Sequence, residues 1–225
     1  MKVTFYGHAC LGIEVAGKHL LFDPFISANE LASQIDIDQI PADYILISHA
    51  HFDHVADVEK IAERTAAKLI SNYEIITHFG NKGLKGHPMN QGGHWKFDFG
   101  TVQYVNAIHT SSFSDGTYGG NPGGFVVSTE EGSFYYSGDT ALTYDMKLIG
   151  EDYDLKFAML CLGDNFTMGV KDAIKAADFV KCEQIIGMHF DTFGYIKIDH
   201  EAAVNQFAAA GKNLHLLALG QEIQI

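Results

Sequence analysis

Three histidines and an aspartate are crowded into one short stretch of this chain. The segment HAHFDH, residues 49–54, carries His49, His51, Asp53 and His54 within six positions. Imidazole nitrogens and carboxylate oxygens are the groups that hold zinc and related divalent cations in proteins. An ordinary surface turn needs no such set, and burying the set would cost free energy unless each polar group found a partner. The stretch therefore predicts one wall of a metal site.

Other ligand-type residues come at the ends of strand-like runs elsewhere in the chain. These runs are residues 43–48, which precede the HAHFDH segment, 102–109, which ends in His109, 124–139, which ends in Asp139, and 184–189, which ends in His189. In α/β proteins, ligands bind in the crevice at the carboxyl ends of the strands. We therefore expect four segments that are distant in sequence to meet at one edge.

Together these side chains suffice for two divalent cations. We assign His49, His51 and His109 to one ion, Asp53, His54 and His189 to a second, and Asp139 to a position that bridges both. Three protein ligands leave an open position for water. Two ions about 3.5–4 Å apart share and deprotonate such a water. Zinc is the first expectation, and manganese, iron, cobalt and nickel also accept histidine and aspartate ligands.

The rest of the chain supplies strands and helices to position these residues. Further strand-like runs cover 2–7, 10–24 with a hairpin at Gly17, and 154–163, and helical patterns cover 57–70, 170–182 and 200–211. No linker or short repeat separates them, so residues 1–225 are expected to form a single α/β domain. The strands are numerous enough for two sheets packed face to face, with helices outside.

Composition and charge argue against several classes of partner. The chain has 15 basic and 28 acidic residues, a net charge of −13, and no basic stripe to follow a nucleic-acid backbone. No apolar run approaches the ~20 residues that span a bilayer, and the first residues lack the apolar segment of a signal peptide. Three scattered cysteines, Cys10, Cys161 and Cys182, indicate a reducing compartment. We expect a cytoplasmic protein without a nucleic-acid or membrane partner, and the oligomeric state is left open.

The HxHxDH pattern, followed by His109, Asp139 and His189, resembles the metallo-β-lactamase superfamily over nearly the whole chain. Several stretches are similar to a branch of compact metal-dependent hydrolases related to ascorbate-6-phosphate lactonase. They are YGHACLGIE, FDPFI, GNPGGFVV, SGDT, and GDNFTMGVKDAIKAADF followed by MHFDTF. The resemblance implies an αββα four-layer sandwich of two mixed sheets, with a dinuclear metal site at one edge.

Two further residues gain roles from this resemblance. Asp23 corresponds to an aspartate that orients a metal-bound imidazole, although an aspartate before Pro24 also suits a turn cap. His8 would lie close to the metals, where it stabilises a developing oxyanion or protonates a leaving group. The alternative for His8 is a partly exposed histidine without a role.

Substrate contacts are expected in two loops. Residues 111–125 hold five glycines directly after His109, and glycine permits close approach to a ligand. Tyr118 and Asn121 are the candidate contacts there, and a plain surface loop is the alternative. The GDNFTMG loop, 163–169, precedes a helix, so its N–H groups can face an anion. The resemblance favours a site role for Asp164 and Thr167, with helix capping as the alternative. No role is assigned to the remaining histidines, His19, His78, His87, His94, His200 and His215.

These features predict a metal-dependent hydrolase that acts on a small ester, lactone, amide or phosphoester. Asp53 would orient the attacking water and accept its proton. A metal-dependent nuclease with the same ligands is one alternative, and the acidic charge argues against it. A non-catalytic metal-binding module is the other, and the complete set of ligand positions argues against that. The natural substrate and the metal are not determined by these patterns.

Overall fold

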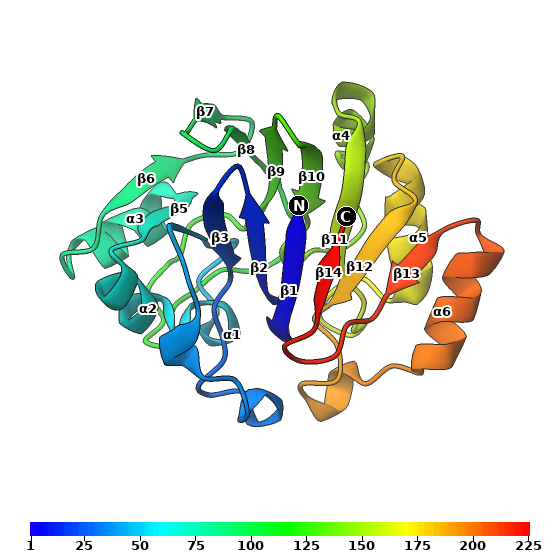
Figure 1. The fold of residues 1–225 in the computed structure, drawn as a ribbon, viewed down its shortest axis with the longest axis horizontal. Coiled ribbons are helices and arrows are strands. Elements are labelled where there is room, and N and C mark those ends of the chain that lie inside the picture. The colour runs from blue at the N-terminus through cyan, green and yellow to red at the C-terminus, as the bar shows by residue number, and fades with distance from the viewer.

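Two seven-stranded sheets lie between two layers of helices in the computed structural model, which describes residues 1–225 (Figure 1). The strands of the first sheet are β1 (Lys2–Gly7), β2 (Cys10–Val15), β3 (Lys18–Phe22), β4 (Tyr44–Leu46), β5 (Lys68–Asn72), β6 (Gly86–Met89) and β14 (Glu222–Gln224). Those of the second are β7 (His94–Lys96), β8 (Thr101–Asn106), β9 (Gly123–Thr129), β10 (Gly132–Tyr136), β11 (Leu155–Cys161), β12 (Gln184–Met188) and β13 (Asn213–His215). The strand orders are β14-β1-β2-β3-β4-β5-β6 and β13-β12-β11-β10-β9-β8-β7.

Both sheets are mixed. In the first sheet, β1, β2 and β3 are antiparallel and β3 to β6 are parallel. The expected hairpin at Gly17 joins β2 to β3, and both Ala16 (φ 51°) and Gly17 (φ 70°) adopt the left-handed backbone that such a two-residue turn requires. In the second sheet, β10 to β13 are parallel and β7 to β10 are antiparallel. Strands β8, β10, β11 and β12 consequently point the same way and end at the same edge.

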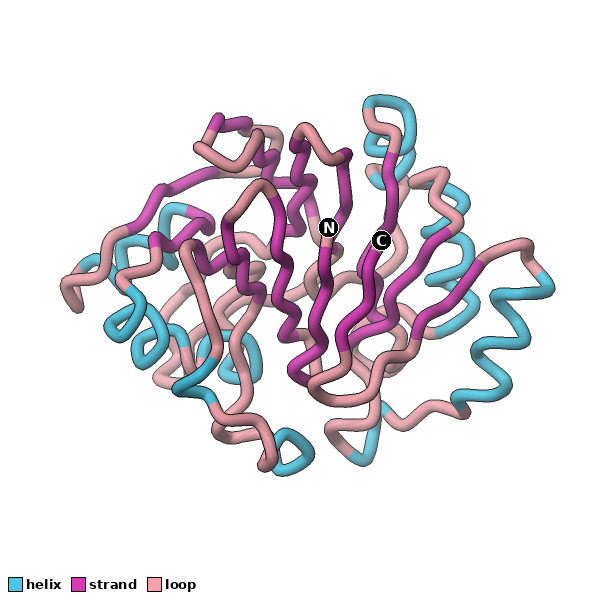
Figure 2. The backbone as a smooth tube through the Cα atoms, viewed as in Figure 1, coloured by secondary structure: helices cyan, strands magenta, loops and turns pink.

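Helices cover the outer face of each sheet, as the cyan segments on either side of the magenta strands show (Figure 2). They are α1 (Phe52–Val55), α2 (Val58–Thr65), α3 (Tyr73–Gly80), α4 (Met146–Asp152), α5 (Val170–Phe179) and α6 (His200–Ala209), with short 3-10 turns η1 (Glu30–Ala32), η2 (Ile37–Gln39) and η3 (Gly194–Ile196). None of these helices has the length and apolarity that a bilayer crossing requires.

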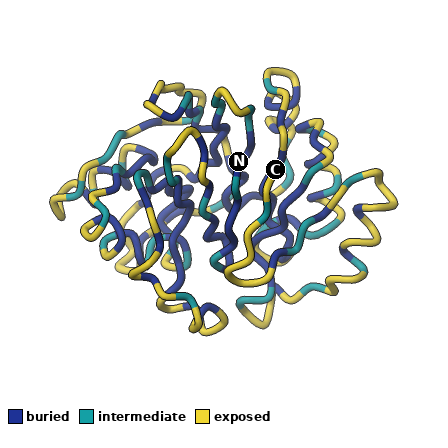
Figure 3. The backbone as a smooth tube through the Cα atoms, in the orientation of Figure 1, coloured by how far each residue is buried: buried dark blue, intermediate teal, exposed yellow.

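Apolar side chains fill the space between the sheets and the space under each helix layer. One cluster, which includes Phe22, Phe125 and Phe134, lies between the sheets, and two others lie beneath the helices of either side. The buried backbone accordingly concentrates in the strands, whereas exposed residues follow the outer helices and loops (Figure 3). The expected αββα sandwich with helices outside is confirmed.

The structure corrects the predicted helix over residues 57–70. Helix α2 ends at Thr65, where the Thr65 hydroxyl donates to the carbonyl of Ile61 at 2.8 Å and Ala66 turns to φ 58°. Leu69 belongs instead to β5, between β4 and β6. The helical pattern continued by chance, because Leu69 is buried in a strand and so satisfies the same apolar spacing.

Other elements differ from the sequence-based expectation. The run over residues 124–139 is a hairpin of two strands, β9 and β10, that turns at Glu130 and Glu131. Helices α3 and α4 and strands β6 and β7 had no prediction at all. They are short, three to eight residues each, and so carry little periodic signal.

Candidate metal centre

Loops at the strand ends bring the predicted ligands together. Three of these loops follow a common pattern: His49, His109 and Asp139 each come three residues after the last residue of β4, β8 and β10, and His189 directly follows β12. In Figure 1, α1 and the ends of β1 and β12 lie in the lower half of the molecule. The two sheets meet there, because the His189 N–H donates to the carbonyl of His8 at 2.8 Å.

The candidate ligands form two groups, and a third, Asp23 with His49 and His54, overlaps both. In each group, one possible ligand atom per residue lies within 4.8 Å of the others; the first group is His49, His51 and His109, and the second is His8, Asp53, His54 and His189. Within the first, Nε2 of His49 is 3.0 Å from Nδ1 of His51. That separation is near the roughly 3.3 Å expected of two nitrogens on a tetrahedral cation with bonds of about 2.0 Å.

Asp139 stands between the two groups. Its Oδ2 atom is 2.8 Å from Nε2 of His189, 3.3 Å from Nε2 of His54 and 3.7 Å from Nε2 of His109. Oδ1 of Asp139, Nε2 of His54 and Nδ1 of His189 are buried and have no hydrogen-bond partner. Buried polar atoms of this kind are costly and rare unless something satisfies them. The donor set therefore fits divalent cations.

Burial and neighbouring charges set the protonation of the cluster. Burial lowers the pKa of His49, His51 and His109, so these imidazoles are neutral, which is the form that ligates metals. Burial also acts to lower the pKa of His54, but the carboxylates of Asp139 and Asp23 outweigh it and hold that pKa well above its usual value. A cation entering the site must therefore displace a proton from His54.

Asp23 lies beneath the second group and is fully buried. Its carboxylate accepts hydrogen bonds from the Ser48 N–H (2.7 Å), the Ser48 hydroxyl (2.5 Å), Nδ1 of His54 (2.8 Å) and the Tyr136 hydroxyl (2.8 Å). Because Nδ1 of His54 donates to Asp23, Nε2 of the same ring is left facing Asp139. The geometry is that of a carboxylate that orients an imidazole.

His8 follows β1 in a left-handed backbone conformation, φ 55°, and only 2% of it is exposed. Nε2 of its ring is 3.1 Å from Oδ2 of Asp53, and Nδ1 is 2.9 Å from the Thr192 hydroxyl. Burial lowers the pKa of His8 to about 4, although the hydrogen bond with Asp53 opposes the shift. We therefore assign a neutral ring in which Nε2–H donates to Asp53 and Nδ1 accepts from Thr192.

The glycine-rich loop, residues 111–125, packs behind the first ligand group. The Ala50 N–H donates to Oγ of Ser111 at 3.1 Å, and the Ser111 hydroxyl donates to the carbonyl of Gly119 at 2.9 Å. A Cβ on Gly119 would lie 2.3 Å from the Cβ of Ala50, so the two backbones approach as closely as glycine allows. The loop thus supports the segment that carries His49 and His51.

Four candidate substrate contacts do not join this cluster. The Tyr118 hydroxyl donates to Oδ1 of Asn121 at 2.9 Å, and both residues are exposed. Oδ1 of Asp164 accepts from the N–H of the next residue at 2.7 Å, and the Thr167 hydroxyl donates to the next carbonyl at 3.4 Å. None of the four hydrogen-bonds to a candidate ligand. Their role as substrate contacts stays a prediction. Helix capping by Asp164 or Thr167, the alternative, is wrong, because α5 begins after Gly169 without a side-chain cap.

Sequence analysis missed four supporting residues: Ser48, Ser111, Tyr136 and Thr192. Ser48 and Ser111 lie next to or near the ligands in sequence, and Thr192 lies in the MHFDTF stretch, so proximity was an available signal. Tyr136 gave none, because an aromatic residue at the end of an apolar strand indicates only a core position.

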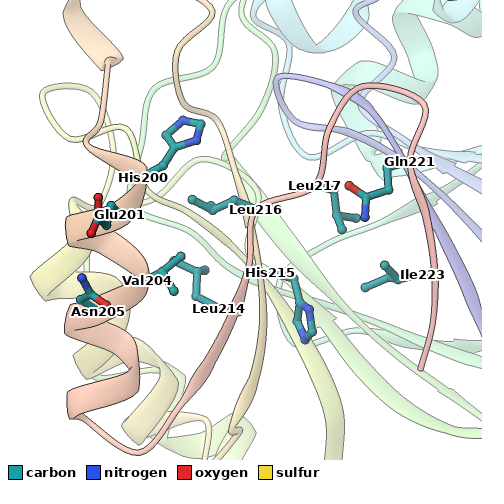
Figure 4. A pocket seen from close by; sticks show the side chains of 10 residues that line it. All are labelled: His200, Glu201, Val204, Asn205, Leu214, His215, Leu216, Leu217, Gln221 and Ile223. Carbon is teal, nitrogen blue, oxygen red and sulfur yellow. The ribbon is translucent and has the colours of Figure 1, made fainter.

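A separate cavity of about 540 Å³ lies between α6, β13 and β14 (Figure 4). Its walls include Val204, Leu214 and Ile223, and no candidate ligand lines it. One residue of its lining, His200, has an Nε2–H that donates to Oδ2 of Asp191 at 2.6 Å.

The fold and the histidine–aspartate cluster define a domain of the β-lactamase superfamily, whose family model matches residues 2–189. A UPF0173 metal-dependent hydrolase of Flavobacterium johnsoniae is 60% identical over 225 residues, and one of Christiangramia forsetii is 55% identical over 226; each match covers 100% of both chains. The solved structure of a metallo hydrolase from the archaeon Ignicoccus hospitalis is 31% identical, with a TM-score of 0.90 over 99% of this chain and 97% of that one. This chain therefore belongs to the UPF0173 family of metal-dependent hydrolases. The predicted superfamily and enzyme class are confirmed, whereas the lactonase-related branch stays a prediction.

Proposed function

We propose that this enzyme hydrolyses a small ester, lactone, amide or phosphoester at a dinuclear metal centre, with zinc as the first candidate. The position of Asp139 carries the proposal. Its Oδ2 atom lies within 3.7 Å of imidazole nitrogens from both ligand groups, as a carboxylate shared by two cations requires. In this proposal His49, His51 and His109 hold one cation, and Asp53, His54 and His189 hold the other.

The bound cations would supply a water made nucleophilic at neutral pH and a polarised bond in the substrate. The chain's own contribution centres on Asp53, whose side chain is 25% exposed while that of Asp139 is 3% exposed. Burial acts to raise the pKa of Asp53, but the hydrogen bond from His8 and the charge of His54 lower it below its usual range. Asp53 is therefore an ionised carboxylate that water can reach, so it can accept a hydrogen bond from the attacking water, orient it, and take its proton as the water adds to the substrate.

His8 acts on this carboxylate. Because its Nε2–H donates to Oδ2 of Asp53, which also lies 4.0 Å from Nε2 of His54, it fixes the rotation of the carboxylate beside the second ligand group. Its lowered pKa, about 4, makes it a poor store for a proton at neutral pH. We therefore assign His8 to orienting Asp53 and to hydrogen bonding, in preference to protonation of the leaving group.

Metal content provides the first test. Elemental analysis of protein purified without chelator, or reloaded with zinc, should give close to two ions per chain. Hydrolysis of a panel of lactone, ester, amide and phosphoester substrates should disappear with chelator and return with metal. Absence of metal uptake would refute the site assignment.

A substitution separates the chemistry from folding. Asp53→Asn keeps the side-chain volume but removes the proton acceptor, so turnover of any active substrate should fall by at least ~10²-fold. The thermal unfolding of the metal-free protein should stay near that of wild type. Asp172→Asn is the matched control, because Asp172 lies in the first turn of a helix, as Asp53 does in α1, but is exposed to solvent. Full activity in Asp53→Asn with normal metal content would show that Asp53 is not the base.

A further inference from the structure

Two phenylalanine rings pack edge to face against His8, and a third packs against one of them. The centroid of the His8 ring is 5.6 Å from that of Phe25 and 5.4 Å from that of Phe193, both edge to face. Phe25 in turn lies 5.9 Å from Phe52 and 6.4 Å from Phe193. The rings come from the segment after β3, from α1 and from the loop after β12, so they form a continuous aromatic wall.

The outer part of this wall is open to solvent. Phe25 is buried at 2% exposure, whereas Phe52 is 53% and Phe193 is 39% exposed. Phe52 is the neighbour of Asp53 in α1, and Asp53 is the candidate ligand carboxylate that solvent reaches most readily. Phe193 packs against His8, whose Nε2–H donates to Asp53. Exposed apolar surface next to a reactive group is a feature of ligand sites, where a few polar groups are combined with an apolar lining.

Positive side chains are absent from the loops around the cluster. Residues 48–57, 106–125, 137–146, 162–169 and 188–196 contain neither lysine nor arginine. Arg64 is the single arginine of the chain, and its guanidinium donates to the carbonyls of Ile37 and Ile40. Phosphate recognition ordinarily uses arginine or lysine. In addition, Asp23, Asp53 and Asp139 would offset most of the charge of two divalent cations, which leaves little field to attract a dianion.

We propose that the substrate is an uncharged carbonyl compound, an ester, lactone or amide, whose apolar group packs against Phe52 and Phe193. This inference rests on the proposed function and narrows it, because phosphoesters and phosphorylated lactones are excluded. Phe52 and Phe193 are specificity-determining residues in this scheme. Asp53 and the metal ligands act on the carbonyl, and the aromatic wall selects what is attached to it.

Binding of two carboxylates to the zinc-loaded enzyme tests the selection without turnover. 3-Phenylpropionate and 3-sulfopropionate have the same carboxylate end. The opposite end is an aromatic ring in 3-phenylpropionate and an anionic sulfonate in 3-sulfopropionate. A sulfonate is a weak metal ligand, so it does not compete with the carboxylate for the zinc ions. By titration calorimetry, we expect 3-phenylpropionate to bind at least about tenfold more tightly, the scale on which one apolar contact discriminates between ligands. The methyl esters of the two acids should differ in kcat/KM in the same direction.

Variants assign the preference to the wall. Phe52→Ser and Phe193→Ser should each lower the affinity for 3-phenylpropionate about tenfold. The affinity for 3-sulfopropionate and the zinc content should stay unchanged. Phe193→Leu should retain most of the affinity for 3-phenylpropionate. Tyr144→Ser is the control, since Tyr144 is 71% exposed and its ring stacks with Phe179 of α5 and with no ring of the aromatic wall. Equal or tighter binding of 3-sulfopropionate would overturn the proposal.

Two further outcomes are decisive. If Phe52→Ser and Phe193→Ser split an oligomer into monomers by light scattering and leave the affinities unchanged, the rings serve self-association and the proposal is wrong. If the binding preference and its loss in the variants are observed but neither ester is hydrolysed, the aromatic selection stands and the proposed hydrolysis fails. The two ideas are therefore separable.

Discussion

Gly119 should be intolerant of even a methyl group, although it is neither a ligand nor in a left-handed conformation. A Cβ at this position would lie 2.3 Å from the Cβ of Ala50 and 2.6 Å from Oγ of Ser111. Carbon atoms in contact are normally about 3.5–4.0 Å apart. In Gly119→Ala the two segments must therefore separate by more than ~1 Å, and Ala50 stands between His49 and His51.

The expected cost follows from these contacts. Overpacking of this kind costs about 1–3 kcal/mol. Displacement of Ser111 also weakens the hydrogen bonds to Ala50 and Gly119, each contributing about 0.5–1.5 kcal/mol. The free energy of unfolding should fall by roughly 2–4 kcal/mol, which lowers the melting temperature by roughly 5–15 °C for a chain of this size. Zinc affinity should fall by about 10–100-fold, as when support of a ligand is lost.

Circular dichroism melts of the metal-free protein and zinc competition against a chelator measure the two effects. Gly80→Ala is the matched control, because a Cβ on Gly80 at the end of α3 meets nothing within 4 Å. The double variant Ala50→Gly/Gly119→Ala moves the methyl group across the contact and should recover part of both losses. Wild-type stability together with wild-type zinc affinity in Gly119→Ala would refute the argument that this loop holds the ligand segment in place.

Three further predictions concern support, pH and partners. Asp23→Asn leaves at least one of four hydrogen-bond donors without an acceptor, so the free energy of unfolding of the metal-free protein in urea should fall by about 2–4 kcal/mol. Zinc affinity should fall about 10–100-fold. An unchanged zinc affinity would contradict the role of Asp23 in orienting His54. The pKa of His8 is lowered to about 4, so between pH 6.5 and 4 the unfolded chain binds the extra proton and stability falls with decreasing pH. Metal-free wild type should lose roughly 3 kcal/mol over that window relative to His8→Gln, and parallel pH profiles would argue against a buried neutral His8. Gel shifts with tRNA and single-stranded DNA at low salt should show no binding, because the net charge is −13; submicromolar binding that weakens steeply with salt would favour the nuclease alternative.

Sequence patterns were sufficient to predict the enzyme class and to name the candidate ligands that the structure brings together. The HAHFDH segment places four ligand-type side chains within six residues, so they are close together whatever fold the chain adopts. His109, Asp139 and His189 were identified because strand ends share an edge, which is a property of sheets in general. Helical periodicity was misleading for residues 66–70, where a buried strand continued the apolar spacing of the preceding helix.

Only the tertiary structure decided which groups support the ligands. Asp23 accepts from Tyr136, which is 113 positions away, and His8 pairs with Thr192, which is 184 positions away. The close packing of Gly119 on Ala50, where an added Cβ would lie 2.3 Å from the Cβ of Ala50, joins segments that carry no shared pattern, and so does the aromatic wall beside His8. The sequence determines what each residue can donate, accept or bury. Which partner it meets depends on how two sheets pack, because that packing sets the distances between loops that are far apart along the chain.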